Sequence, residues 1–488
     1  MQAILLSKLV MLQTLCASVS IASIMYLRGV FIVLYLNTAR YGEPTVLAGL
    51  GYRFRRVVSF LFSLLFVVVL LVAASSLKFS TFCAQLILRT APPRPFLHIE
   101  QERHKSRTPT GKVSVLDAAY YASIVGLHVE KTEVITSDGF VLAMLRVIDP
   151  KDTASERTQR AKYPVLLVHG LMGCAGVFFA NEEDSLAFVL CKSGYDVWIS
   201  NNRGGVDHKH KDYKYNDPRS WEWDVTDMAT KDLPAFVDYV LAATGHDKLA
   251  LVCHSQGGAQ TFLALSRKHC PDLGLKISVF CALGPAVYAG PEIDRIFFKL
   301  VRYLPHSVYD LIFGIHAFIP LVITIKPLLP AWLLSSCGFA LSYFLFHWSN
   351  RLWDRAMGSR MFQFIPVYTS AECLRWWLGR GGFSSKRCIF DSTEEPWFDE
   401  RCPPVGLWIG GSDTLVDGNK LLERLESEPH VSLVAKSIIE PYDHMDLLWA
   451  IDVPEKVGTG VKETIWATAW NPDRFVCPDG CEELQLLN

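Results

Sequence analysis

One serine of this chain stands where its side chain would be reactive. Ser255 lies in the segment Cys253-His254-Ser255-Gln256-Gly257, between an apolar run at 249–253 and a helical pattern at 257–266. A strand, a sharp turn and a helix in this order project the turn residue at the carboxyl end of a sheet. The positive end of the helix lies beside that residue and favours an alkoxide. We therefore predict that Ser255 is a nucleophile.

The first position of this turn holds Cys253, where the usual pattern has glycine. Small residues are needed on both sides of the nucleophile because the neighbouring backbones pack closely. Cysteine is small, so we expect the turn to form with some crowding. The thiol is not expected to attack a substrate, since Cys253 lies in the strand, two positions before the apex of the turn.

A serine is inert at neutral pH unless a base and an oriented acid activate it. In folds with this turn, the acid and then the histidine follow the serine along the chain. Asp413 comes just after an apolar strand at 405–409, and His444 follows a weaker strand at 437–440. We predict Asp413 as the acid and His444 as the base, with Asp417 as the alternative acid. The other histidines after Ser255 lie at a helix end, in an apolar insertion or before the last strand: His269, His306, His316, His347 and His430.

The tetrahedral intermediate of acyl transfer needs two backbone N–H donors for its oxyanion. Gln256 follows the nucleophile and is expected to supply one of them. The loop His169-Gly170-Leu171-Met172-Gly173 follows the strand at 165–168 and is expected to supply the other, from Leu171. The chain has no HExxH motif and no paired CxxC motifs. We therefore expect neither a metal ion nor a cofactor.

The elements that must position these residues alternate between strands and helices. Short apolar runs predict strands, and the pair at 132–136 and 140–147 flanks a hairpin turn, Ser137-Asp138-Gly139. The other predicted strands are 165–168, 195–200, 249–253, 277–283, 405–409 and 437–440, and the predicted helices are 228–243 and 257–266. Strands that are apolar throughout are buried on both faces. The pattern predicts an α/β fold with a mostly parallel sheet covered by helices on both sides.

The alternation is interrupted between 290 and 402. Two strongly apolar segments, 311–325 and 328–346, are separated there by Lys326-Pro327. Each segment is short or interrupted by proline, so two membrane-spanning helices are the less favoured interpretation. We favour an inserted cap that covers the reactive serine and touches lipid.

The composition indicates that part of the chain lies against lipid, lines a deep pocket, or does both. Half of the 488 residues are hydrophobic, 20% are charged and the mean hydropathy is +0.21, which is unusual for a fully soluble protein. The excess is concentrated in the segments 9–36 and 57–77. The second segment has 21 uncharged residues, which span ~31 Å as a helix, about one hydrocarbon core. We predict that it inserts into a membrane; the first segment is either a second membrane helix or a signal peptide.

The remaining counts bear on partners and compartment. A net charge of −1 gives no basic surplus for nucleic acid. The 13 cysteines leave at least one thiol unpaired, and most stand singly in apolar runs, as buried free thiols do. Cys477 and Cys481 are the only close pair. Because no asparagine begins an N-x-S/T sequon, we favour a catalytic part that faces the cytosol.

Several segments together resemble the acid lipase and steryl ester hydrolase family of α/β-hydrolases, most of all its membrane-anchored fungal members. The resemblance runs from about 117 to 453 and rests on TSDGFVLAMLRV (136–147), VLLVHGLMG (165–173), SLAFVLCKSGYDVWISNNRGG (185–205), WDVTDMATKDLPAFVDYVLAATG (223–245), HSQGG (254–258), LGPA (283–286), GGSDTLVD (410–417) and YDHMDLLWA (442–450). It implies Ser255 as nucleophile, Asp413 as acid and His444 as base. The departures from the family pattern are Cys253, Gly258, Asn201 and Gly205.

The resemblance implies a serine ester hydrolase that acts on neutral lipid esters, steryl esters first and triacylglycerols as the alternative. The domains we expect are a membrane module at 1–90, a linker at 91–112, an α/β-hydrolase domain at 113–460 with the cap at 290–402, and a C-terminal tail at 461–488. The expected partners are the lipid ester and a membrane or lipid-droplet surface, with no nucleic acid. The anchor would sit in the endoplasmic reticulum, a lipid droplet or the plasma membrane, with the catalytic domain in the cytosol. A catalytically inactive scaffold that binds lipid is the competing class, which loss of a triad member would favour.

Overall fold

A single mixed sheet organises the chain. The computed structural model describes residues 57–77, 95–100, 116–152, 161–391, 395–484 and 486. Eight strands of these residues form one sheet in the order β1-β2-β4-β3-β5-β6-β7-β8. The strands are β1 (His128–Ile135), β2 (Val141–Ile148), β3 (Pro164–Val168), β4 (Asp196–Ser200), β5 (Leu249–His254), β6 (Ile277–Leu283), β7 (Val405–Gly410) and β8 (Leu433–Ile439). The β1–β2 and β2–β4 pairs are antiparallel and the other five pairs are parallel, which confirms the predicted sheet.

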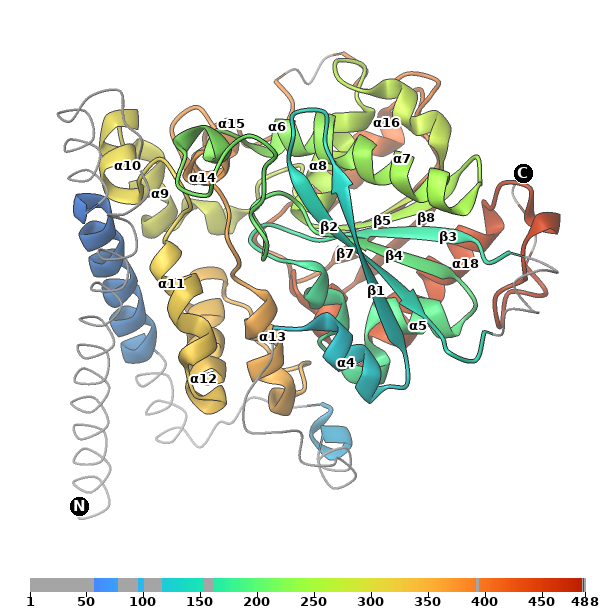
Figure 1. The fold of residues 1–488 in the computed structure, drawn as a ribbon, viewed down its shortest axis with the longest axis horizontal. Helices are drawn as coiled ribbons and strands as arrows, with labels where there is room; N and C mark the ends of the chain where they lie inside the picture. The colour runs from blue at the N-terminus through green and yellow to red at the C-terminus, as the bar shows by residue number, and fades with distance from the viewer. Residues whose placement is uncertain are drawn as a thin grey trace. The chain divides into compact units, whose positions relative to one another are not determined.

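Helices cover both faces of the sheet (Figure 1). Each face has its own apolar core. The α-helices between residues 116 and 484 that lie outside the insertion are α4 (Ala118–Ile124), α5 (Leu186–Lys192), α6 (Val225–Asp227), α7 (Leu233–Thr244), α8 (Gln256–Leu265), α16 (Gly418–Ser427), α17 (Asp446–Trp449) and α18 (Thr459–Ala467). On β3, Leu166 and Val168 join the core beneath α7 and α8, whereas Val165 and Leu167 join the core beneath α5 and α18. All four side chains are fully buried. Burial on both faces explains why the central strands show no alternation in sequence.

The helix predicted at 228–243 begins with a π-helical turn, Met228–Asp232, and continues as α7 to Thr244. It ends at Gly245, whose φ of 70° is left-handed. A residue without Cβ adopts this conformation at little cost, so glycine is the usual residue at such a helix end.

The two edge strands differ most from the sequence-based expectation. β1 begins at His128, four residues before the predicted start, and β8 covers Leu433–Ile439 instead of 437–440. Both strands are largely half-buried or exposed, with only Val134 of β1 and Ile439 of β8 buried. Because an edge strand buries few side chains, its sequence carries a weaker apolar signal than that of a central strand.

The segment predicted as a C-terminal tail packs onto the sheet. Helix α18 buries Val461 and Ile465 in the core beneath α5, and Phe475 and Cys481 are buried in the same core. The folded domain therefore continues past 460.

The described residues of the insertion between β6 and β7 form ten short helices. They are η7 (Pro291–Asp294), α9 (Ile296–Tyr303), α10 (His306–Phe313), α11 (Pro320–Ile325), η8 (Lys326–Leu328), α12 (Ala331–Phe346), η9 (Arg355–Met357), α13 (Gly358–Phe364), α14 (Ala371–Leu378) and α15 (Phe383–Lys386). The apolar segments 311–325 and 328–346 are thus divided among several elements. The longest, α12, has 16 residues, which is ~24 Å and short of a hydrocarbon core.

A separate apolar helix, Val57–Leu77, lies near the N-terminus of the chain. It has 21 residues with a mean hydropathy of 3.0, and among the described residues it is the one helix long and apolar enough to cross a membrane. The other predicted membrane segment, 9–36, lies outside the described residues.

Candidate active site

Ser255 occupies a strained turn between β5 and α8. Its φ and ψ angles are 56° and −116°, a region that non-glycine residues rarely adopt and that costs free energy. The backbone holds it there, because Ser255 N–H donates to the Leu283 carbonyl at 3.0 Å and the Ser255 carbonyl accepts from Ala286 N–H at 3.1 Å. A Cβ at Gly257 would lie 2.5 Å from the Val168 carbonyl oxygen. Glycine is therefore required directly after the turn, as the sequence pattern predicts.

Cys253 fits this turn although glycine is usual at its position. The residue is fully buried in β5, and its Sγ lies 3.2 Å from Thr261 Oγ1 on α8. Burial raises the pKa of the Cys253 thiol far above its ordinary value. A thiol that stays protonated is a poor nucleophile, which supports Ser255 over Cys253 as the attacking residue.

A chain of two hydrogen bonds joins the three residues predicted to act together. His444 Nε2 lies 2.8 Å from Ser255 Oγ, and His444 Nδ1 lies 2.6 Å from Asp413 Oδ2. A carboxylate only accepts, so Nδ1–H donates to Asp413 and leaves the Nε2 lone pair facing the serine hydroxyl. In this arrangement Nε2 is placed to take a proton from the serine hydroxyl.

The structure distinguishes the two candidate acids. Asp413 Oδ2 faces His444, while its Oδ1 accepts the backbone N–H groups of Leu415 at 2.9 Å and Val416 at 3.2 Å. Asp417 instead caps α16, where its side chain accepts Lys420 N–H at 3.0 Å. Only Asp413 therefore contacts the imidazole.

The loop predicted to hold the oxyanion lies against Ser255. A Cβ on Gly170 would lie 3.0 Å from Ser255 Cβ, so glycine permits this approach. His169 fixes the loop: its Nδ1 lies 2.8 Å from the Gly170 carbonyl, and its Nε2 accepts Asn202 N–H at 3.1 Å. Burial lowers the pKa of His169 to about 4, which keeps this ring neutral and its tautomer fixed.

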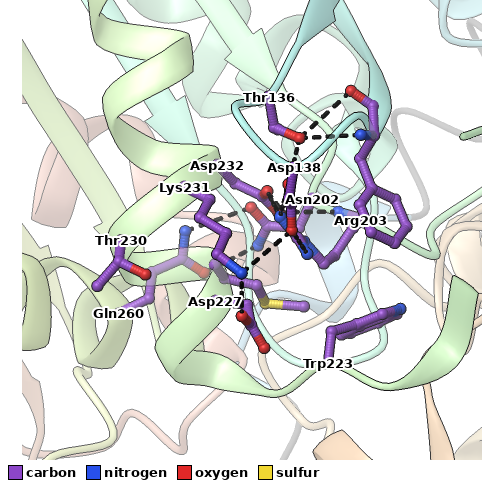
Figure 2. Close-up of polar contacts among 12 residues, drawn as sticks. Thr136, Asp138, Asn202, Arg203, Trp223, Asp227, Thr230, Lys231, Asp232 and Gln260 are labelled. Atoms are coloured by element: carbon purple, nitrogen blue, oxygen red, sulfur yellow. Dashed lines mark hydrogen bonds and ion pairs between the residues drawn. The ribbon is translucent and has the colours of Figure 1, made fainter. Parts of the chain in front are cut away.

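A buried ionic network surrounds Arg203, the residue that follows Asn202 in the chain (Figure 2). The Arg203 guanidinium is 1% exposed and contacts Asp232 at 2.6 Å and Asp138 at 2.9 Å. Burial opposes ionisation of Asp138, but hydrogen bonds and charge from Arg203 hold the pKa of that carboxyl well below its usual value. Asn202 also bonds to Gln260 of α8 at 3.0 Å. The network therefore connects the oxyanion loop to the helix that follows Ser255, and the sequence analysis did not identify it.

The insertion contacts Gln256, the predicted oxyanion donor at the start of α8. The side chain of Gln256 accepts the indole N–H of Trp377, on α14, at 2.8 Å and lies 3.8 Å from the Cys373 thiol. Its amide nitrogen lies 3.3 Å from Met228 Sδ. These contacts fix the side chain of Gln256 and so restrain the start of α8, where the backbone N–H of Gln256 is located.

The insertion also contacts the loop that carries His444. The Trp348 ring stacks on the imidazole with centroids 6.0 Å apart and planes at 16°, and the next residue, Ser349, donates its N–H to Asp443 at 2.7 Å. Asp446 accepts the indole N–H of Trp353 at 2.5 Å and the N–H of Asp443 at 2.6 Å. Ser255 is 8% exposed and His444 is 2% exposed, and the insertion contacts both the loop of His444 and the side chain of Gln256. We keep the name cap for this insertion; that it covers a bound ester stays a prediction.

Comparisons with known proteins show which proteins this chain is similar to. The model of a partial alpha/beta-hydrolase lipase region matches residues 118–182, and the model of the alpha/beta hydrolase fold matches residues 163–287. Sterol esterase 2 of Saccharomyces cerevisiae is 32% identical over 390 residues, 72% of this chain and 72% of that protein. A probable lipase of Schizosaccharomyces pombe is 34% identical over 68% of this chain and 76% of its own. Human gastric triacylglycerol lipase is 28% identical over 67% of this chain and 85% of its own.

Proposed function

We propose that this chain, which belongs to the acid lipase and steryl ester hydrolase family of α/β-hydrolases and is a carboxylic ester hydrolase, cleaves neutral lipid esters. Steryl esters are the substrate that we favour, and Ser255, Asp413 and His444 are the residues that we assign to catalysis. The observation that carries the proposal is the unbroken hydrogen-bonded chain from Ser255 through His444 to Asp413. A serine, a base and an orienting acid in this order form the arrangement that splits ester hydrolysis into two easier steps.

In the first step Ser255 Oγ attacks the ester carbonyl carbon while its proton passes to His444 Nε2. Asp413 stabilises the imidazolium that forms. The negative charge on the carbonyl oxygen is held by the backbone N–H groups of Leu171 and Gln256. When the tetrahedral intermediate collapses, the C–O bond to the alcohol breaks, and the alcohol leaves with the proton from His444.

In the second step water replaces the alcohol. His444 Nε2 removes a proton from the water, whose oxygen attacks the acyl carbon on Ser255. The same two N–H groups hold the oxyanion again. Collapse releases the fatty acid and returns the proton to Ser255 Oγ, so the enzyme is regenerated without any cofactor.

Two relatives bear on the substrate. Sterol esterase 2 is matched over 72% of its length at 32% identity, which supports a steryl ester as the substrate. Gastric triacylglycerol lipase is matched over 85% of its length at 28% identity, and triacylglycerol is therefore the second candidate. Both are uncharged esters of fatty acids, and the helix Val57–Leu77 supports a supply of either ester from a lipid phase.

We also propose the domain plan and compartment that the sequence indicates. Residues 1–90 would anchor the chain in the endoplasmic reticulum, a lipid droplet or the plasma membrane, with 91–112 as a linker and the catalytic domain in the cytosol. Among the described residues, Cys477 and Cys481 are free thiols, and so are Cys174, Cys191, Cys253, Cys270, Cys281, Cys373, Cys388 and Cys402. Because disulfide bonds form in oxidising compartments, so many free thiols support a reducing compartment for the catalytic domain.

The proposal is tested with purified full-length protein in detergent and matched emulsions of cholesteryl oleate and triolein. The wild type is expected to release oleate from cholesteryl oleate faster than from triolein. Ser255→Ala is expected to reduce both rates by a factor of about 10⁴ or more. A higher rate on triolein would replace the steryl ester with triacylglycerol as the substrate. Equal rates for the wild type and Ser255→Ala would refute the catalytic assignment.

A further inference from the structure

The helix Val57–Leu77 packs against the cap along one side. The residues of this side recur every three or four positions, the spacing that places side chains on one face of a helix: Ser59, Ser63, Phe66, Leu70 and Ala74. Ser63 is 4% exposed, Leu70 is 8% and Ala74 is 1%. The helix thus has a defined inner face, although all 21 of its residues are uncharged.

Two serine hydroxyls on the inner face bond to the end of α10. Ser59 Oγ and Ser63 Oγ donate to the Ile312 carbonyl at 3.2 and 3.1 Å. Carbonyl groups in the last turn of a helix have no partner within the helix. In hydrocarbon an unpaired carbonyl is especially costly, because no water can replace the missing donor. The two serines therefore supply hydrogen bonds that α10 needs if it lies in a lipid environment.

Close packing accompanies these hydrogen bonds. Gly314 has a φ of 81°, and a Cβ on it would lie 2.9 Å from Ser59 Oγ. The absence of a side chain at 314 is thus what allows Ser59 to approach the end of α10. One turn further along, the Phe66 ring meets the Phe313 ring edge to face, with centroids 5.4 Å apart and planes at 88°.

The second half of the inner face contacts α12. Leu70 and Ala74 form a buried cluster with Ala340 and Phe344 of α12. The helix therefore bridges α10 and α12, two cap helices that are separated in sequence by α11 and η8. Figure 1 shows this helix in blue beside the yellow cap helices.

The opposite face of the helix is apolar and uncovered. Leu65 is 59% exposed, Val68 is 46% and Val72 is 60%. Large apolar residues of the cap are also exposed: Ile296 and Leu300 of α9 at 62% and 60%, and Trp332 of α12 at 61%. Water is a poor solvent for so much apolar surface, whereas a helix of 21 uncharged residues matches the thickness of a hydrocarbon layer.

We propose that the helix Val57–Leu77 is a fixed element of the cap, and that its outer face lies in the hydrocarbon of the lipid membrane that anchors the protein. The helix then attaches the protein to the membrane and also positions the cap, because Ser59, Ser63 and Phe66 join the two. A water-insoluble ester would reach the cap from hydrocarbon without crossing water. The docking of the helix does not depend on which ester is cleaved, and its test does not require activity.

Photo-crosslinking in intact membranes tests both faces. In the chain, p-benzoylphenylalanine replaces Phe66 in one variant and its neighbour Leu65 in another. Each variant is expressed in cells whose membranes contain a radiolabelled phospholipid, and the membranes are then irradiated. Phe66→p-benzoylphenylalanine is expected to crosslink within the chain, to a peptide that contains Ile312 and Phe313. Leu65→p-benzoylphenylalanine is expected to crosslink to lipid. Lipid adducts at both positions, or no adduct to the α10 peptide from position 66, would overturn the docking; a protein adduct from position 65 would overturn the lipid-facing assignment.

A pair of double variants separates docking from simple insertion. Ser59→Leu with Ser63→Leu removes both hydroxyls and makes the helix more apolar, so the chain stays in the membrane. We expect the adduct from position 66 to the α10 peptide to fall several-fold in this background. Leu61→Ser with Leu65→Ser places two serines at the same spacing on the outer face and is expected to keep the adduct. Equal adduct yields in the two backgrounds would show that the serines do not hold the helix to the cap.

Discussion

The carboxyl edge of the sheet and the cap that covers it are held together in different ways. At the edge, Ser255, Asp413 and His444 stand in short turns after buried strands, and backbone hydrogen bonds fix each turn. In the cap, aromatic side chains join short helices to one another, and several helices expose large apolar residues. From this comparison we expect the chemical step to depend on the edge, whose turns are held by backbone hydrogen bonds, and access of the ester to depend on the cap.

The largest effect is expected for the acid at the rigid edge. Asp413→Asn replaces the acceptor of the His444 Nδ1 proton with an amide that can stabilise the wrong tautomer, so kcat should fall about 10³–10⁴-fold. Asp417→Asn is the matched control, because asparagine caps a helix about as well as aspartate. We expect it to retain nearly full activity. The measurement is steady-state hydrolysis of a soluble short-chain ester, and a severe loss in Asp417→Asn with a mild one in Asp413→Asn would reverse the assignment.

A smaller effect is expected where the cap contacts the site. Trp377→Phe removes the indole N–H that bonds to the Gln256 side chain and leaves that buried oxygen with the weaker thiol donor of Cys373. The backbone N–H of Gln256 would then be held less firmly toward the oxyanion. We expect kcat on the same ester to fall roughly 10-fold, which corresponds to about 1.4 kcal/mol of activation free energy, with little change in KM. Trp376→Phe changes the neighbouring, half-buried tryptophan and should have no comparable effect. If both variants change KM alone, the cap contact serves binding and does not position the oxyanion donor.

The last effect concerns stability in acid and is expected to leave the catalytic rate unchanged. Burial lowers the pKa of His208 to about 3, while an unfolded histidine titrates near 6.5. Below pH 6.5 the unfolded chain therefore binds a proton that the folded chain does not, and stability is lost as the pH falls toward 3. His208→Phe preserves the stacking on Trp221, whose centroid lies 3.8 Å away, and removes this proton uptake.

Urea unfolding at pH 7.5 and pH 5 measures this difference. The free energy of unfolding should fall less between pH 7.5 and pH 5 in His208→Phe than in the wild type. The expected difference between the two decreases is about 2 kcal/mol. Burial also lowers the pKa of His254, to about 3, so both proteins should still be less stable in acid. An equal loss in wild type and variant would mean that His208 is protonated in the folded protein.

The fold and the candidate residues could be predicted because their signals are local. Each of β5, β7 and β8 leads into a short turn, and the residue types in those turns indicated Ser255, Asp413 and His444 before any contact was known. The central strands are buried on both faces, so each appears in the sequence as an uninterrupted apolar run. The mostly parallel sheet is confirmed, whereas the catalytic roles stay predictions until they are measured.

The contacts between cap and site could not be predicted, because they join residues far apart in sequence. Trp377 is 121 positions from Gln256, and Trp353 is 93 positions from Asp446. A tryptophan in an apolar stretch does not indicate which buried acceptor its N–H will reach. The inner face of the helix Val57–Leu77 was missed for the same reason, since Ser59 and Ser63 gain their meaning only from the carbonyl of Ile312.

The most direct test of the central claim is active-site labelling by a fluorophosphonate, with the adduct located by mass spectrometry. Native full-length protein is expected to carry one adduct, on Ser255, and to lose esterase activity in proportion to labelling. His444→Ala should label far more slowly, because the serine then lacks its base. An adduct on another residue, or full labelling of Ser255→Ala, would contradict the account.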